Sequence, residues 1–122
     1  MQEFTEEPEK VVMSYIKALD EQDYELAGKY LNNNVRIQGP DGESFRSPVE
    51  FVEMLRHFRG KYDVKKSFAD ENDVCLLYDL KTPATTVFMC SWYQVNEGRI
   101  TVIRTVFDPR QFTQNQNAQT KE

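Results

Sequence analysis

Asp79 is the residue of this chain best suited, by type and spacing, to move a proton. It lies in the apolar segment 74–80, where alternate side chains share one face of a strand. On a face that lines an apolar cavity, burial would favour the protonated carboxyl, and Asp79 would then be a candidate general base. On the opposite face it would be a solvated carboxylate close to Lys81. The sequence favours neither position over the other.

Tyr15 and His57 are two further candidates for a catalytic or hydrogen-bonding role. Tyr15 closes an apolar stripe of helical spacing, so it is either a hydrogen-bond donor at the floor of a cavity or a core residue with a buried partner. His57 is the only histidine and could exchange protons near neutral pH. Its place beside another apolar helical stripe favours the solvent edge, which argues against catalysis.

Three segments have the pattern of helices. Apolar residues recur at helical spacing over residues 11–19. Asp23 can cap a second, shorter helix that carries apolar residues as far as Leu31. Ser47 opens a capping box, with proline and then glutamate behind it, which predicts a third helix that stops at Gly60.

The remaining apolar runs predict strands. The last two flank the turn Asn96-Glu97-Gly98 and are expected to form a β-hairpin. The predicted strands span residues 35–38, 62–69, 74–80, 85–95 and 99–107. The order α-α-β-α-β-β-β-β predicts an α+β domain over residues 1–110, in which a curved sheet wraps around three helices and leaves a cavity. The polar tail 111–122 is predicted to be disordered.

The element order and local signatures resemble the NTF2-like superfamily, in particular its SnoaL-like and ketosteroid-isomerase-like branch. The resemblance covers about residues 8–110, and it implies a cystatin-like cone with a strongly curved, mostly antiparallel sheet. The segments that carry it are Tyr15 to Asp20 with Asp23, Tyr30-Leu31, Gly39 to Gly42, the capped third helix, Glu97 to Ile100 and Phe107-Asp108.

The chemistry of ketosteroid isomerases is only partly matched. The resemblance places Gly39 where their carboxylate base should be, and Ser91 where their protonated aspartic acid should be. Tyr15 matches their oxyanion tyrosine, Tyr30 matches a tyrosine that supports it, and Leu55 replaces another supporting tyrosine. Without the base, steroid isomerisation by that mechanism is not expected.

The resemblance also assigns the two faces of the terminal hairpin. Together with the candidates above, it predicts a pocket lined by Tyr15, Tyr30, Met54, Phe58, Leu77, Asp79, Met89, Ser91, Tyr93, Ile103, Thr105 and Phe107. The other face is expected to form a homodimer interface through Phe88, Cys90, Trp92, Val102, Arg104 and Val106. Trp92 and Arg104 would be its anchors. A one-residue shift of register would exchange the two faces.

Composition and charge narrow the classes of function. The net charge is −5, and the 15 basic residues are scattered, which argues against nucleic-acid binding. Cys75 and Cys90 lie in strand patterns and are expected to behave as small apolar residues rather than as metal ligands or a disulfide framework. Neither a membrane-spanning run nor a secretory signal is recognisable, so a cytoplasmic location is the default expectation. No cofactor or metal is expected.

Three hypotheses follow for the function. The first is a module that binds a small apolar or aromatic molecule in its cone. The second is an enzyme of the isomerase, cyclase or hydrolase type, with Asp79 as general base and Tyr15 as hydrogen-bond donor. The third is a protein-interaction module that uses the outer face of the sheet. The fold itself does not choose between them, because one fold hosts many functions.

Overall fold

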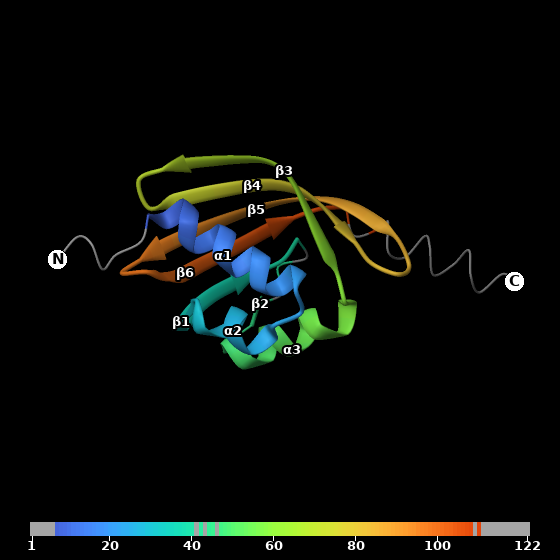
Figure 1. The fold of residues 1–122 in the computed structure, drawn as a ribbon, viewed down its shortest axis with the longest axis horizontal. Helices are drawn as coiled ribbons and strands as arrows, with labels where there is room; N and C mark the ends of the chain where they lie inside the picture. The colour runs from blue at the N-terminus through green and yellow to red at the C-terminus, as the bar shows by residue number, and fades with distance from the viewer. Residues whose placement is uncertain (1–6, 41, 43, 46, 109, 111–122) are drawn as a thin grey trace, which may run out of the picture.

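The computed structural model describes residues 7–40, 42, 44–45, 47–108 and 110, and the predicted tail 111–122 lies outside this part of the chain. The chain forms an α+β fold of three helices and one mixed, mostly antiparallel sheet (Figure 1). Its elements are α1 (Pro8–Asp20), α2 (Tyr24–Lys29), β1 (Leu31–Gln38), β2 (Ser44–Phe45), α3 (Pro48–Phe58), β3 (Lys61–Asp70), β4 (Asp73–Lys81), β5 (Thr86–Asn96) and β6 (Arg99–Val106). The predicted order is confirmed, and the two-residue strand β2 is an addition to it.

The first strand begins earlier than expected. Asp23 caps α2 by accepting a hydrogen bond from the amide of Leu26, but α2 ends at Lys29. Leu31, predicted to lie in this helix, is the first residue of β1 and pairs with Ile100 of β6. Strand pairing thus prevails over the helical pattern at this point.

Helix α3 begins as predicted and ends at Phe58, so that Gly60 follows its C-cap residue Arg59 as expected. The Ser47 hydroxyl accepts a hydrogen bond from the amide of Glu50 at 3.2 Å, as a capping residue does. The left-handed residue that ends the helix is Arg59, with φ of 51°, and not Gly60. Gly60 lies close to Leu80, and a Cβ atom there would displace the end of the Leu80 side chain.

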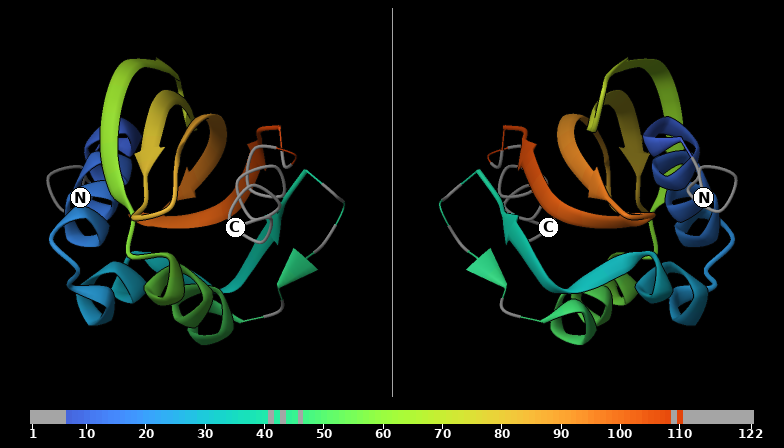
Figure 2. Two further views of the ribbon diagram at one scale, coloured as in Figure 1. Left: turned by 90° about the vertical axis from the view of Figure 1, so that its right-hand side faces the viewer. Right: turned by 90° about the vertical axis from the view of Figure 1, so that its left-hand side faces the viewer.

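The six strands follow the order β2-β1-β6-β5-β4-β3. β1 and β6 are parallel, and the other neighbours are antiparallel. The turn between β5 and β6 places both Glu97 and Gly98 at positive φ, as a two-residue hairpin turn requires. Seen from the end, the sheet curves strongly, with α1 along one side and α3 next to β1 (Figure 2).

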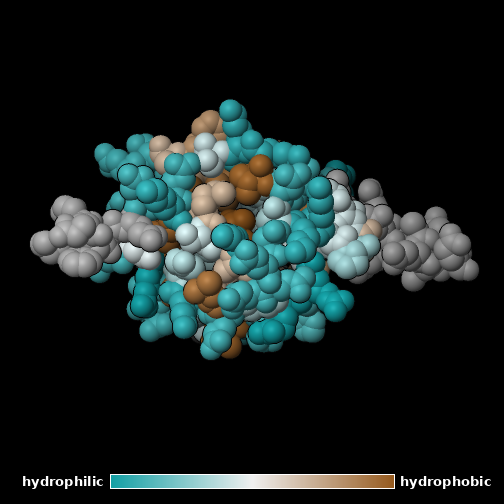
Figure 3. Space-filling model, viewed as in Figure 1, coloured by the Kyte–Doolittle hydropathy of each residue, from teal (hydrophilic) through white to brown (hydrophobic). Residues whose placement is uncertain are grey.

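The core lies between the concave face of the sheet and the helices. α1 packs against β3, β4 and β5, and α3 packs against β1 and β2. The apolar stripe predicted over 11–19 is buried, including Val11, Val12, Tyr15 and Leu19. The face of the molecule that carries α1 is otherwise mostly hydrophilic, with small separate hydrophobic areas (Figure 3).

Candidate functional site

An apolar cavity lies inside the cone, between α1, α3 and the concave face of the sheet. Its volume is about 150 Å³. Its wall is made of apolar and aromatic side chains, with a few neutral polar groups. The lining residues are Tyr15, Leu19, Ile37, Gln38, Gly39, Pro40, Phe45, Phe51, Met54, Leu55, Phe58, Tyr62, Tyr78, Leu80, Met89, Tyr93, Ile103, Thr105 and Phe107.

Four tyrosines from four different elements form one side of this cavity. Tyr15 comes from α1, Tyr62 from β3, Tyr78 from β4 and Tyr93 from β5. The rings of Tyr15 and Tyr93 meet edge to face, with centroids 6.2 Å apart, and those of Tyr62 and Tyr78 lie 5.6 Å apart. Burial raises the pKa of all four hydroxyls, so each is a neutral donor at physiological pH.

Tyr78 is held by a chain of hydroxyl groups. Its hydroxyl lies 2.9 Å from that of Ser91, which in turn lies 2.8 Å from the hydroxyl of Thr105. Burial raises the pKa of Tyr78 to about 12, and these hydrogen bonds act in the opposite direction. Ser91 is fully buried but does not line the cavity. Its role is therefore to position Tyr78 from behind.

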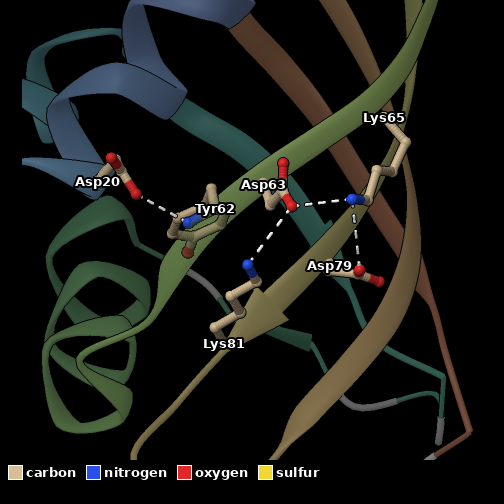
Figure 4. Close-up of polar contacts among 6 residues, drawn as sticks. All are labelled: Asp20, Tyr62, Asp63, Lys65, Asp79 and Lys81. Atoms are coloured by element: carbon tan, nitrogen blue, oxygen red, sulfur yellow. Dashed lines mark hydrogen bonds and ion pairs between the residues drawn. The ribbon is translucent and has the colours of Figure 1, made fainter.

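A hydrogen bond of its backbone amide positions Tyr62. Its amide donates a hydrogen bond of 2.8 Å to the carboxylate of Asp20, at the end of α1 (Figure 4). The neighbouring Lys61 ammonium donates to the backbone carbonyl of the same aspartate at 2.7 Å. These two bonds fasten the start of β3 to α1, and they fix where the Tyr62 ring enters the cavity.

The Tyr15 hydroxyl is available to a ligand. Tyr15 is only 2 % exposed, and no described residue forms a hydrogen bond with its hydroxyl. Every fully enclosed side-chain nitrogen or oxygen of the described residues has a hydrogen-bond partner. The unpartnered hydroxyl of Tyr15 is thus not fully enclosed, and the cavity is the space that it borders.

Asp79 and Leu77 were predicted to line the pocket, and the structure places both on the opposite face. The inward residues of β4 are the alternate ones, such as Tyr78 and Leu80. The carboxylate of Asp79 lies 3.8 Å from the ammonium of Lys65, in a cluster of charges on the outer surface (Figure 4). The prediction that Asp79 acts as a general base in the cavity is therefore wrong. The cause is that both faces of β4 carry apolar side chains, so alternation alone does not select the inner one.

Two other predicted pocket residues, Tyr30 and Ser91, also lie away from the cavity wall, and His57 lies at the solvent edge that its helical spacing favoured. His57 is exposed in the last turn of α3 and does not face the cavity. Tyr30 is half-buried against the core, where its carbonyl accepts a hydrogen bond from Ile100. Ser91 lies behind the wall, as described above. The other predicted pocket residues do line the cavity: Tyr15, Met54, Phe58, Met89, Tyr93, Ile103, Thr105 and Phe107.

Tyr62 and Tyr78 were missing from the sequence prediction. Alternation along this strand puts Tyr78 on the face opposite Asp79, and the sequence did not decide which of the two faces is the inner one. Tyr62 lies near the start of β3, where apolar and charged residues are mixed, and its place in the cavity wall depends on the tertiary contact of this segment with Asp20. A clue was present in the alternating tyrosine and leucine residues of segment 76–80.

The outward residues of the hairpin form a partly exposed apolar surface. Phe88 and Val106 are 55 % and 53 % exposed, and Trp92 is 39 % exposed. The indole NH of Trp92 donates a hydrogen bond of 2.9 Å to Asp73, so this side chain is held within its own chain. Cys90, Val102 and Arg104 also point outward on these strands.

The described residues contain no group of three or more histidine, cysteine or carboxylate side chains arranged to hold a metal ion. Within the same part of the chain, no helix is long and apolar enough to cross a membrane.

Comparisons with known proteins agree with the architecture. Residues 12–103 match the family described as SnoaL-like domain. An NTF2-like protein of unknown function from Cytophaga hutchinsonii is 30 % identical, with a TM-score of 0.82 over 87 % of this chain and 94 % of that one. None of the curated proteins matches this chain.

Two more distant structures share the fold alone. An LEH-like epoxide hydrolase from M. tuberculosis is 22 % identical, with a TM-score of 0.72 over 91 % of this chain and 90 % of that one. A de novo designed protein with a curved β-sheet is 24 % identical, with a TM-score of 0.74 over 94 % and 96 % of the two chains. An enzyme and a designed protein thus have the same architecture, so the architecture does not specify an activity.

Proposed function

This chain belongs to the SnoaL-like domain family of the NTF2-like superfamily, and from that premise we propose that it binds a small uncharged molecule inside its cone. The ligand has one aromatic ring, or an apolar skeleton of that size, and an oxygen atom that accepts a hydrogen bond. The observation that carries the proposal is the apolar cavity bordered by tyrosine hydroxyls, in whose wall the described residues place no charged side chain.

The size and polarity of the cavity define the ligand class. A cavity of about 150 Å³ with apolar walls is large enough for a benzene-sized molecule. A charged ligand would lose its hydration without gaining an opposite charge from the described part of the wall, where no lining residue is acidic or basic. A neutral aromatic compound loses little on entry and gains the contact of the apolar wall.

Tyr15 would orient the ligand. Its hydroxyl keeps its proton, because burial raises its pKa, and it lacks a partner among the described residues. A carbonyl or ether oxygen of a bound molecule would accept this hydrogen bond. Tyr78 is less available, since Ser91 already holds its hydroxyl.

The same wall argues against proton abstraction in the cavity. A general base must reach the substrate by a hydrogen bond, directly or through one water molecule. No carboxylate or imidazole belongs to the lining residues that the structure describes. We therefore favour binding over an isomerase or cyclase mechanism that depends on a protein base.

Three related probes test the proposal by thermal unfolding. Acetophenone has a ring and an acceptor oxygen, ethylbenzene has no acceptor, and benzoate is charged. Acetophenone is expected to raise the unfolding temperature in a concentration-dependent way, ethylbenzene less so, and benzoate not at all. The absence of any shift with both neutral probes would contradict the proposal.

A variant that fills the cavity is the matched control. Leu55→Trp places a large ring into the wall from α3, whereas Val49→Trp adds the same ring to an exposed position of that helix. Leu55→Trp is expected to abolish the acetophenone shift, and Val49→Trp to keep it. Equal shifts in the two variants would mean that the probe binds elsewhere.

For the outer face, we propose that two copies associate through β5 and β6. The exposed Phe88, Trp92 and Val106 provide apolar area that a second copy would remove from water. Arg104 lacks an ion-pair partner among the described residues and could find one across the interface. The interaction with a different protein is the competing possibility.

Light scattering after size-exclusion chromatography tests this association. The wild-type chain is expected to elute as a dimer, and Val106→Lys as a monomer. Val49→Lys, at a residue of α3 that is 73 % exposed, is the control and should stay dimeric. A wild-type monomer would reject the homodimer and favour a different protein partner for this face.

A further inference from the structure

Cys75 and Cys90 meet on the outer face of the sheet, on the opposite side from the cavity. Their sulfur atoms lie 3.5 Å apart, and both side chains are free thiols of intermediate exposure. They belong to the neighbouring antiparallel strands β4 and β5. Cys75 pairs with Trp92 and Cys90 pairs with Leu77, so the two cysteines are diagonal neighbours.

We propose that Cys75 and Cys90 form a redox modification site that a small-molecule disulfide, such as oxidised glutathione, converts reversibly into a cross-strand disulfide bond. This inference is independent of ligand binding in the cone, and it concerns the monomeric chain, because the association proposed through β5 and β6 would cover Cys90.

The reaction is two successive thiol–disulfide exchanges. One protein thiolate attacks a sulfur of the small disulfide, which forms a mixed disulfide and releases one small thiolate. The second protein thiolate attacks the protein sulfur of that mixed disulfide, and the second small thiolate leaves. Two electrons pass to the small disulfide, and the two protons of the protein thiols end on the two released thiols.

Geometry explains why the bond would be reversible. The two sulfur atoms are already in contact, so only a short approach is needed. Diagonal neighbours in an antiparallel pair have Cα atoms roughly 7–8 Å apart, whereas disulfides rarely span more than about 6.8 Å. The bond would draw the strands together and carry strain, and strained disulfides are the easily reduced ones.

The site lies directly behind the cavity wall. On the inner face of the same two strands, Tyr78 and Ser91 form the hydrogen bond that positions the Tyr78 ring. In the register, Ser91 pairs with Leu76 and the next residue, Cys90, pairs with Leu77. A shorter distance between β4 and β5 on the outer face would thus change the position of the Tyr78 ring.

Alkylation of the full-length chain in glutathione buffers of graded redox ratio tests the proposal. Dilute protein is equilibrated, quenched with acid and alkylated with iodoacetamide, and the mass of the intact protein is then measured by mass spectrometry. Two alkylated thiols are expected in reducing buffer. In oxidising buffer we expect none, a mass lower by two hydrogens, and no glutathione adduct. Reduced glutathione should restore both thiols.

The single variants Cys75→Ser and Cys90→Ser are the controls. Each keeps one thiol and is expected to accumulate a glutathione adduct that the wild type resolves. Fluorescence of Trp92, the only tryptophan, should change on oxidation of the wild type, because this residue pairs with Cys75.

Peptide mapping of the oxidised wild type should show a linked Cys75–Cys90 peptide. Because this measurement uses only the wild type, it does not depend on how the variants fold. The proposal is overturned if both thiols stay alkylated in the most oxidising buffer. It is also overturned if the wild type accumulates glutathione adducts or disulfide-linked dimers.

Discussion

The hydroxyl groups of Tyr78 and Ser91 lie 2.9 Å apart, and Ser91 continues the chain to Thr105. The position that the family resemblance assigns to a protonated acid thus holds a neutral hydroxyl, behind the cavity wall rather than at it. Among the described lining residues, the polar groups are hydrogen-bond donors and acceptors, and none of them is a carboxylate or an imidazole. This arrangement suits recognition of a neutral molecule better than proton transfer.

Ser91→Ala is expected to destabilise the fold. The substitution leaves Tyr78 and Thr105 without their shared partner in a buried place, which costs on the order of 1–3 kcal/mol. Urea unfolding measures the loss. Ser44→Ala, at an exposed serine of β2, is the control and should change the free energy of unfolding by less than about 0.5 kcal/mol. Equal effects of the two substitutions would contradict a structural role of the hydroxyl chain.

Alkaline pH should destabilise the protein through Tyr78. Its pKa is raised from 10.0 to about 12, so the folded chain keeps a proton that the unfolded chain has lost. The stabilisation is complete below pH 10 and is lost as the pH rises from 10 to about 12. Two pKa units correspond to roughly 3 kcal/mol.

Urea unfolding at a series of pH values measures this effect. Compared with the wild type, Tyr78→Phe should lose less stability between pH 10 and 12, because one titrating group is gone. The same pH slope in both proteins would show that Tyr78 titrates alike in the folded and unfolded chain.

The sequence predicts the fold better than it predicts the site. The capping box at Ser47, the hairpin turn at Glu97 and Gly98, and the apolar stripe of α1 are local signals, and the structure contains each of them. Their order along the chain was enough to identify a curved-sheet cone. Local signals of this kind depend on residues close in sequence, so a single chain reveals them.

The cavity wall depends instead on contacts between distant residues. Tyr62 is placed by a bond to Asp20, 42 residues away in sequence. β4 carries apolar residues on both faces, so its alternation fits either orientation of Asp79. The role of Gly60 likewise comes from the close approach of Leu80, which the sequence does not show.

Gly60→Ala is expected to weaken ligand binding more than it weakens the fold. The added methyl group would collide with the end of the Leu80 side chain, which lines the cavity and can turn into it. The expected cost in stability is about 1 kcal/mol, as for moderate overpacking. The thermal shift caused by acetophenone should become several-fold smaller. Full retention of that shift, at any stability, would contradict this account of Leu80.

Asp79→Asn should leave both ligand binding and stability almost unchanged. The carboxylate points away from the cavity, and its 3.8 Å pair with Lys65 is partly solvated. Such pairs contribute between about 0 and 1 kcal/mol. Isothermal titration with acetophenone and urea unfolding are the measurements. A large loss of binding would mean that Asp79 reaches the cavity in solution, and it would revive the general-base hypothesis.

Tyr15→Phe should separate the two parts of ligand recognition. The substitution keeps the ring that packs against Tyr93 and removes the hydroxyl that has no partner among the described residues. A neutral hydrogen bond contributes about 0.5–1.5 kcal/mol, so the affinity for acetophenone should fall roughly 2- to 12-fold. The affinity for ethylbenzene, which has no acceptor, should stay the same. Tyr24→Phe, at a buried tyrosine outside the cavity wall, is the matched control and should affect neither probe. An equal loss for both probes would show that Tyr15 shapes the cavity and does not donate a hydrogen bond to the ligand.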